Sequence, residues 1–165
     1  VLAPCAYGRP DHPVVAAIVH RVRELLDTEG NSDLRVLAGL GLCSYAHTSG
    51  DLSMAESVLA AISPRLASDD VSATAVARFL GGMGYCFYAM NRFADAMRFY
   101  AKARTIAQQH GLTHHDFAVA TWRGYCEWRM GDLEAMGRTI QELGDMRMPD
   151  SGPGMVFPPQ RKARL

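Results

Sequence analysis

The same turn signal occurs three times in this chain, at intervals of 41 and 40 residues. Each copy is a short polar turn followed by an apolar residue: Gly50-Asp51-Leu52, Asn91-Arg92-Phe93 and Gly131-Asp132-Leu133. No proline occurs between Pro64 and Pro149, and the apolar residues there fall three and four positions apart, as amphipathic helices require. The pattern therefore predicts an all-α protein in which each turn joins two helices into a hairpin.

The helix boundaries follow from the apolar spacing and from the residues at the turns. Asp51 and Asp132 are predicted N-caps, because a short side-chain oxygen can accept a backbone N–H of the first helical turn. Gly111 is a predicted C-terminal stop. The expected helices span residues 13–28, 33–48, 52–66, 72–90, 93–109, 115–130 and 132–144.

The second hairpin carries the sharpest pattern of large and small residues. It runs through Leu80, Met83, Gly84 and Phe87 to the turn, and then through Phe93, Ala96, Tyr100 and Ala103. This pattern resembles the tetratricopeptide repeat, in which small residues, here Gly84 and Ala96, let the two helices approach closely. The first and third copies are degenerate, with Cys43 in place of the glycine and Met136 in place of the alanine. The resemblance implies a right-handed α-solenoid of helix hairpins.

A period of about 40 residues divides the chain into a half unit and three full units. Residues 1–12 are expected to be irregular, and residues 149–165, with four of the eight prolines, are expected to form a flexible tail. The chain begins on half a repeat and with Val1 rather than Met, so we expect a fragment of a longer array. The half unit spans 13–31, and the full units of the repeat domain (13–148) span 32–70, 71–111 and 112–148.

Charge and hydropathy limit the classes of partner. The chain has 17 basic and 17 acidic residues, and the basic tail after residue 148 carries +2, which leaves the repeat body at −2. Nucleic acid and anionic membranes attract basic surfaces. No apolar run approaches the roughly 18 residues of a membrane span. We therefore expect a cytoplasmic protein that binds neither nucleic acid nor membrane through this segment.

No motif predicts catalysis or a cofactor. Neither lysine follows a glycine, which excludes the phosphate-binding loop GxxxxGK[ST]. The glycine-rich run 81–84 lies inside a helical pattern and indicates close helix packing. Three of the four cysteines are predicted to be buried thiols, because they lie among apolar neighbours on the first helices of the hairpins: Cys43, Cys86 and Cys126.

One cluster has the residue types of a metal site. His110, His114, His115 and Asp116 could supply imidazole and carboxylate ligands. However, Gly111 is predicted to break the helix between His110 and His114, which removes the geometry that would aim both at one ion. We expect no metal site here, and an exposed helix start instead.

Tetratricopeptide arrays place the first helix of each hairpin on a concave face, and the resemblance carries this face to the present chain. It implies a surface for a protein or peptide, with a small inducer as the alternative ligand. Tyrosine, tryptophan and arginine supply large contact areas with a polar tip. The other reading left open is that these rings pack against a neighbouring helix or against a part of a longer protein outside this chain. The candidate residues are His47, Arg78, Tyr85, Tyr88, Thr121, Tyr125, Trp128 and Arg129.

The Gly-Asp-Leu turns and the step His110-Gly111-Leu112 between units are similar to the helical repeat region of large bacterial signal-transduction ATPases. Maltose-activator and LuxR-type transcriptional regulators belong to this class. The resemblance covers about residues 12–145 and implies a non-catalytic module that senses an inducer or a regulatory protein. The competing hypothesis is a scaffold that only spaces or oligomerises other domains. Open ends of the stack also predict a homodimer.

Overall fold

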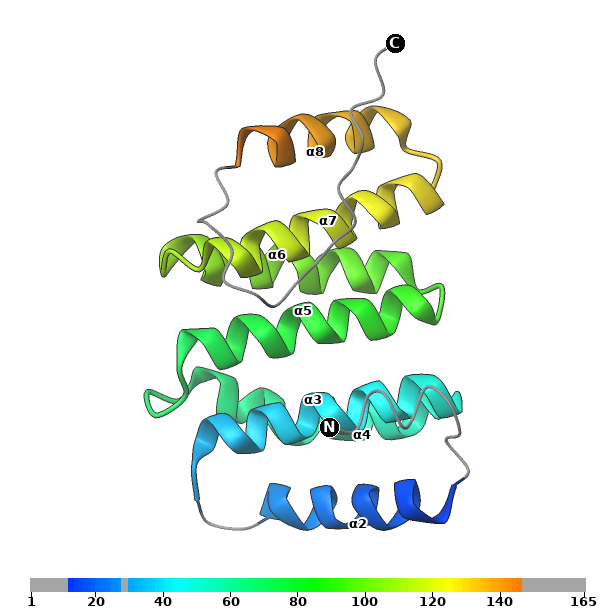
Figure 1. Cartoon of the computed structure of the whole chain (residues 1–165), viewed down its shortest axis with the longest axis vertical. Coiled ribbons are helices and arrows are strands. Elements are labelled where there is room, and N and C mark those ends of the chain that lie inside the picture. Colours follow the sequence, from blue (N-terminus) through cyan, green and yellow to red (C-terminus); the bar gives the residue numbers. More distant parts are fainter. Residues whose placement is uncertain (1–11, 28–29, 147–165) are drawn as a thin grey trace.

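A computed structural model describes residues 12–27 and 30–146 of the 165-residue chain. All regular secondary structure in these residues is helical, which confirms the predicted all-α class. Three antiparallel helix pairs follow an initial helix in chain order along the long axis of the molecule (Figure 1). The helices are α2 (Pro13–Asp27), α3 (Ser32–Ser49) with α4 (Leu52–Ile62), α5 (Ala73–Ala89) with α6 (Phe93–Gln109), and α7 (Thr113–Arg129) with α8 (Leu133–Asp145).

The observed boundaries lie within two residues of the expected ones, except at the end of α4. There the α-helix stops at Ile62 and continues as the 3-10 helix η1 (Ser63–Ala67). Pro64 explains this, since proline has no backbone N–H to donate to the preceding helical turn. The expected irregular start and the expected tail lie outside the described residues, apart from His12.

The three hairpin turns share one backbone geometry. In each, a single residue adopts the left-handed conformation, with φ of 74° at Gly50, 59° at Asn91 and 78° at Gly131. Glycine and asparagine are the residues that tolerate this conformation best. In each turn the N–H of this residue is donated to the carbonyl oxygen three positions earlier in the chain. The recurring turn signal therefore encodes a recurring turn.

The predicted N-caps are confirmed at two of these turns. The side-chain oxygen of Asp51 accepts the N–H of Met54, and that of Asp132 accepts the N–H of Ala135, each at 2.9 Å. Arg92 occupies the same place at the middle turn, and its side chain makes no capping hydrogen bond. It instead forms ion pairs with Glu56 and Asp95.

Small residues bring the helices of a pair together. A Cβ atom added at Gly84 would run into the ring of Tyr100, which is completely buried together with Ala96. The close contact predicted for the second hairpin is therefore confirmed. In the third hairpin Thr139 lies against Gly124, with its methyl carbon 3.2 Å from the position of an added Cβ. Ile140, which matches Tyr100 one repeat earlier, is exposed, so α8 is turned by about one residue relative to α6.

The glycine run in α5 also lets neighbouring pairs approach. A Cβ added at Gly82 would collide with Leu40 of α3, and one added at Gly81 would lie 3.1 Å from a methyl carbon of Val119 in α7. This confirms that the run serves helix packing. Among the described residues, no helix is both long enough and apolar enough to cross a membrane.

The three cysteines of the first helices are buried thiols, as expected. Burial raises the pKa of Cys86 to about 12 and that of Cys126 to about 11, and it raises the pKa of Cys43 further still. A thiol with such a pKa is protonated at neutral pH and is a poor nucleophile.

Candidate functional site

Five aromatic side chains form a continuous row of rings across the first helices of the three pairs. The row runs from α3 through α5 to α7, and we call it the aromatic ladder. Its centroid distances are 5.8 Å for His47–Tyr85, 4.7 Å for Tyr85–Trp122 and 5.4 Å for Trp122–Tyr125. Tyr88 lies 6.4 Å from Tyr85 and 5.6 Å from Trp122. All of these separations lie in the range in which aromatic rings attract one another.

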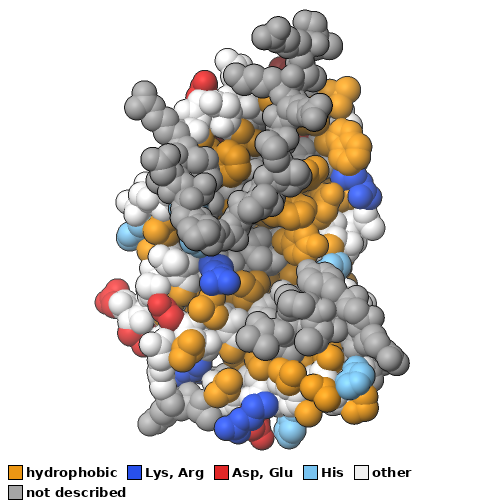
Figure 2. All heavy atoms as spheres, in the orientation of Figure 1, with side chains coloured by type: hydrophobic (Ala, Val, Ile, Leu, Met, Phe, Trp, Pro, Cys, Tyr) orange, Lys and Arg blue, Asp and Glu red, His pale blue; other side chains and the backbone are white. Residues whose placement is uncertain are grey.

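The ladder residues lie in the C-terminal halves of their helices, toward the hairpin turns. Figure 2 shows hydrophobic side chains on the viewed face, including a group on the side where these turns lie in Figure 1. The ladder is most open at α7, where Tyr125 is 45% exposed and Trp128, three positions further along, is 55% exposed. His47, Tyr85 and Trp122 are half-buried. Along the ladder from α3 to α7, the rings therefore change from half-buried to exposed.

The structure brings four of the eight predicted residues into the ladder: His47, Tyr85, Tyr88 and Tyr125. Arg129 lies at its edge, where the Nη2 group donates to the side-chain oxygen of Asn91 at 2.8 Å. The guanidinium group of Arg129 also lies 5.3 Å from the ring centroid of Phe93. Arg129 therefore ties the end of α7 to the turn between α5 and α6.

The three remaining predicted residues, Arg78, Thr121 and Trp128, lie outside the ladder, and Trp128 is exposed beside it. The hydroxyl group of Thr121 donates to the backbone oxygen of Phe117 at 2.9 Å, within its own helix. Arg78 is exposed and lies near the start of α7, where it acts on His115. The pKa of His115 is lowered, mainly by burial and also by the charges of Arg78 and His114. Arg78 therefore lies in the N-terminal half of α5, whereas the ladder residues of this helix lie in its C-terminal half.

Trp122, which contacts three other rings of the ladder, was not among the predicted residues. The position one repeat earlier is Gly82, so an alignment of the repeats marks no aromatic residue there. The available signal was the spacing within α7. Trp122, Tyr125 and Trp128 follow one another at intervals of three, which places them on one side of a helix.

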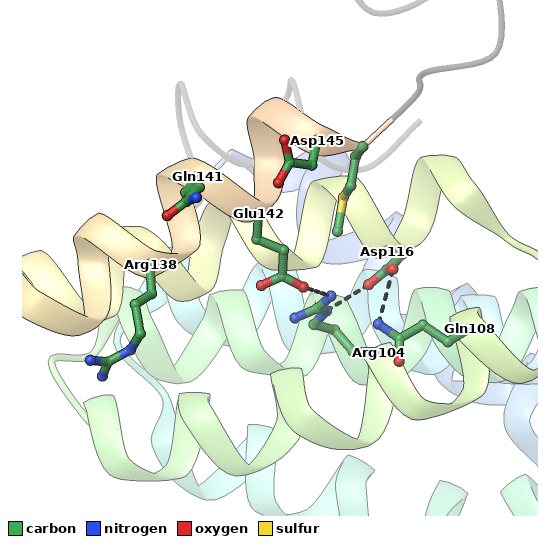
Figure 3. Close-up of a pocket in the computed structure, with 8 residues that line it drawn as sticks. Arg104, Gln108, Asp116, Arg138, Gln141, Glu142 and Asp145 are labelled. Atoms are coloured by element: carbon green, nitrogen blue, oxygen red, sulfur yellow. Dashed lines mark hydrogen bonds and ion pairs between the residues drawn. The ribbon is translucent and has the colours of Figure 1, made fainter.

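The other notable group of side chains is a polar network between α6, α7 and α8. Arg104, which is almost completely buried, donates through Nε to a side-chain oxygen of Asp116 at 2.6 Å. Its Nη2 group pairs with Glu142, and Gln108 donates to the second oxygen of Asp116 at 3.1 Å (Figure 3). The Arg104 guanidinium is the main cause of a lowered pKa at Glu142. The polar network therefore joins three helices through ion pairs.

The same network continues into the α7–α8 pair. Arg123 donates through Nη2 to Glu142 at 2.6 Å and to the hydroxyl oxygen of Thr139 at 2.8 Å. That hydroxyl group donates in turn to Glu127 at 2.7 Å, and both residues are buried. The polar network explains why Thr139 and Glu142, rather than Leu133 and Ile140, are turned toward α7.

A shallow hollow of about 470 Å³ adjoins this network. Asp116, expected at an exposed helix start, is largely buried there because Arg104 and Gln108 engage both of its oxygens. The principal charges of the hollow are thus paired with one another, which suits a structural role better than ligand binding. The lining residues are Arg104, Gln108, Asp116, Arg138, Gln141, Glu142, Asp145 and Met146 (Figure 3).

Within residues 12–27 and 30–146, no three His, Cys, Asp or Glu side chains are placed to hold a metal ion together. Comparison of the chain with models of known protein families, with curated proteins and with solved structures found no match. The likeness to tetratricopeptide regulators therefore rests on the sequence pattern, and the function has to be inferred from the geometry of the ladder.

Proposed function

We propose that this chain is a non-catalytic recognition module and that the aromatic ladder is its binding surface. The helix pairs would form a tetratricopeptide-like, right-handed solenoid with a period of about 40 residues. Three turns of equal geometry, 41 and 40 residues apart, support this arrangement. Such a module fits the repeat region of a larger bacterial transcriptional regulator, in which other domains would hydrolyse ATP and bind DNA.

The observation that carries the proposal is the continuity of the ladder over three helix pairs. Each ring is held by the next one, so a partner that binds there would immobilise few additional side chains. Preorganised aromatic rings are therefore efficient contact residues. The exposed rings of Tyr125 and Trp128 leave large apolar areas available at the α7 end.

The shape of the surface favours a protein or an extended peptide over a small inducer. Small-molecule sites are usually enclosed concave pockets. The ladder becomes exposed at its α7 end, and the described hollow lies elsewhere, on α6, α7 and α8. Peptides that lie along aromatic surfaces use repeated ring contacts of the kind that the ladder offers. We therefore assign a peptide segment as the ligand class.

The second candidate function is a structural scaffold without a ligand. The half-burial of Tyr85 and Trp122 favours it, because those rings already pack between α5 and α7. In that case the ladder would only hold neighbouring helix pairs together. Trp128 distinguishes the two candidates, since its exposed ring contributes little to packing.

A selection from a random peptide library on the immobilised chain tests the proposal. We expect selected peptides to protect the backbone amides around Tyr88 and Tyr125 from hydrogen exchange. Protection confined to α6 and α8, or a library that yields no peptide, would favour the scaffold. A chain with Tyr125→Ala serves as the counter-selection, because it removes an exposed ring without opening the core.

A further inference from the structure

Helix α8 presents an apolar stripe to the outside of the molecule. Leu133 is 62% exposed and Ile140 is 59% exposed. Gly137 and Gly144 alternate with them, and nothing lies within 4 Å of a Cβ atom added at either glycine. Positions 133, 137, 140 and 144 follow the helical spacing of four, three and four, so they form one line along the helix. We call these four residues the α8 stripe.

The polar network explains why the stripe faces outward. Thr139 and Glu142, on the opposite side of α8, are held by Arg123, Glu127 and Arg104. This attachment fixes the rotation of α8 and directs Ile140 away from α7. The preceding second helix, α6, is packed against both α5 and α7, whereas α8 has no such following helix among the described residues.

The order of large and small residues in the stripe is symmetric about one point. The midpoint between residues 133 and 144 is also the midpoint between residues 137 and 140. Two antiparallel copies of α8 centred there would place Leu133 opposite Gly144 of the partner subunit. They would also place Ile140 opposite Gly137 of the partner subunit. Each large side chain then meets the notch left by a glycine.

We propose that two copies of this chain associate through an antiparallel pairing of their α8 stripes. Two-fold symmetric dimers use the same patch on both subunits, so the patch has to be complementary to itself. A partner of different sequence would not require large and small residues to be arranged symmetrically. The half-buried side chains of Met136 and Leu143 flank the stripe on one side and would widen the contact.

The sequence of residues 147–165 suits this surface less well, because it contains Pro149, Pro153, Pro158 and Pro159 and shows no matching symmetric order of large and small residues. A contact confined to two 13-residue helices would be small. We expect it to bury less than the roughly 1,200 Å² typical of stable complexes and to give a reversible dimer with a dissociation constant on the order of 10 µM.

Analytical ultracentrifugation of the full chain tests the proposal. We expect a monomer–dimer equilibrium that Ile140→Ser weakens at least about tenfold, since it removes a central contact. Gly137→Gln provides a sharper variant. It fills the notch and abolishes dimerisation, yet it raises the melting temperature of the monomer, because glycine is a poor helix former. Loss of the dimer together with a stabilised fold cannot come from unfolding.

A disulfide cross-link tests the antiparallel register. In the double variant Leu133→Cys, Gly144→Cys, oxidation should give a covalent dimer, whereas each single variant should not. The two positions are 11 residues apart on one helix, about 16 Å, so they cannot bond to each other within a subunit. The unsubstituted chain controls for its native cysteines.

Two results would overturn the proposal. One is a strict monomer up to several hundred micromolar. The other is a large decrease in the melting temperature of Ile140→Ser at protein concentrations at which the chain is monomeric. Such a decrease would show that another part of the same chain covers the stripe. Neither result bears on the aromatic ladder, which is formed by α3, α5 and α7.

Discussion

The centroid of the indole ring of Trp122 on α7 lies 4.7 Å from the centroid of the phenol ring of Tyr85 on α5, and the interplanar angle is 63°. This edge-to-face contact connects the rings of α3 and α5 with those of α7. It also distinguishes Trp122, which belongs to the ladder, from Trp128, which lies beside it. Trp122 contacts three rings and is half-buried, whereas Trp128 lies further along the same helix and is mostly exposed.

Trp122→Ala should therefore destabilise the fold much more than Trp128→Ala. Removing the half-buried indole forfeits its contacts with Tyr85, Tyr88 and Tyr125 and should lower the free energy of unfolding by about 2 kcal/mol. Removing an exposed ring should change it by less than about 0.5 kcal/mol. Urea denaturation followed by circular dichroism measures both values. Equal losses would show that Trp128 is also a packing residue.

Two glycine substitutions should have opposite signs. Gly84→Ala places a methyl group against the ring of Tyr100, and the resulting overpacking should cost about 1–3 kcal/mol. Gly137→Ala meets nothing within 4 Å and should stabilise α8 by about 0.5–1 kcal/mol, the difference in helix propensity. Thermal unfolding of both variants checks the pair. A stabilising Gly84→Ala would refute the close contact between α5 and α6.

The hairpins were predictable from the sequence because their signals are local. Gly50, Asn91 and Gly131 mark turns that need a left-handed residue, and Asp51 and Asp132 cap the helices that follow. The rotation of α8 was not predictable in this way. It depends on ion pairs between side chains far apart in the chain, such as Arg104 and Glu142. The repeat pattern alone would have placed Ile140 inside.

Only part of the ladder was predicted, because an alignment of the repeats finds only residues whose type recurs one repeat later. Residues that recur one repeat apart, such as Tyr85 and Tyr125, could be found by aligning the units. Trp122 was missed because Gly82 holds the matching place. Arg78 was expected on the same concave face as Tyr85 and Tyr88, but it takes no part in the ladder and acts on His115 instead. Alignment of the repeats identifies which face of a helix a residue occupies. It does not show which side chains on that face contact one another.

Removal of the central arginine of the polar network should be strongly destabilising. Arg104→Ala leaves the largely buried carboxylate of Asp116 without its cation and leaves Glu142 paired with Arg123 alone, which should cost about 2–4 kcal/mol. Arg98→Ala on the same helix is the matched control. Arg98 is 77% exposed, and Asp95 is its ion-pair partner among the described residues, so the expected loss is below about 1 kcal/mol. Similar losses in both variants would contradict a structural role for the network.

Stability should fall as the pH drops below about 6.5, the ordinary value for histidine. Burial lowers the pKa of His47 in the folded chain, and burial is also the main cause of the lowered pKa of His115. The unfolded chain therefore binds more protons in this range, and acid favours unfolding. The lowered pKa of Glu142 acts only at more acidic pH, below its ordinary value of about 4.5.

Melting temperatures at pH 7.5 and pH 5.5 check this dependence. The decrease between these two pH values should be smaller for His47→Gln than for the unsubstituted chain, because one of the two histidines no longer titrates. An identical decrease in both proteins would contradict a lowered pKa of His47 in the folded chain.

The affinity of a selected peptide for two variants of the chain tests the recognition surface most directly. Trp128→Ala removes an exposed ring beside the ladder, whereas Lys102→Ala changes an exposed residue on α6. Fluorescence titration should show a dissociation constant at least about tenfold higher for Trp128→Ala, as expected for an aromatic contact residue. It should show an unchanged value for Lys102→Ala. Equal affinities for both variants and the unsubstituted chain would contradict the assignment of the ladder, with the exposed ring of Trp128 at its α7 end, as the binding surface.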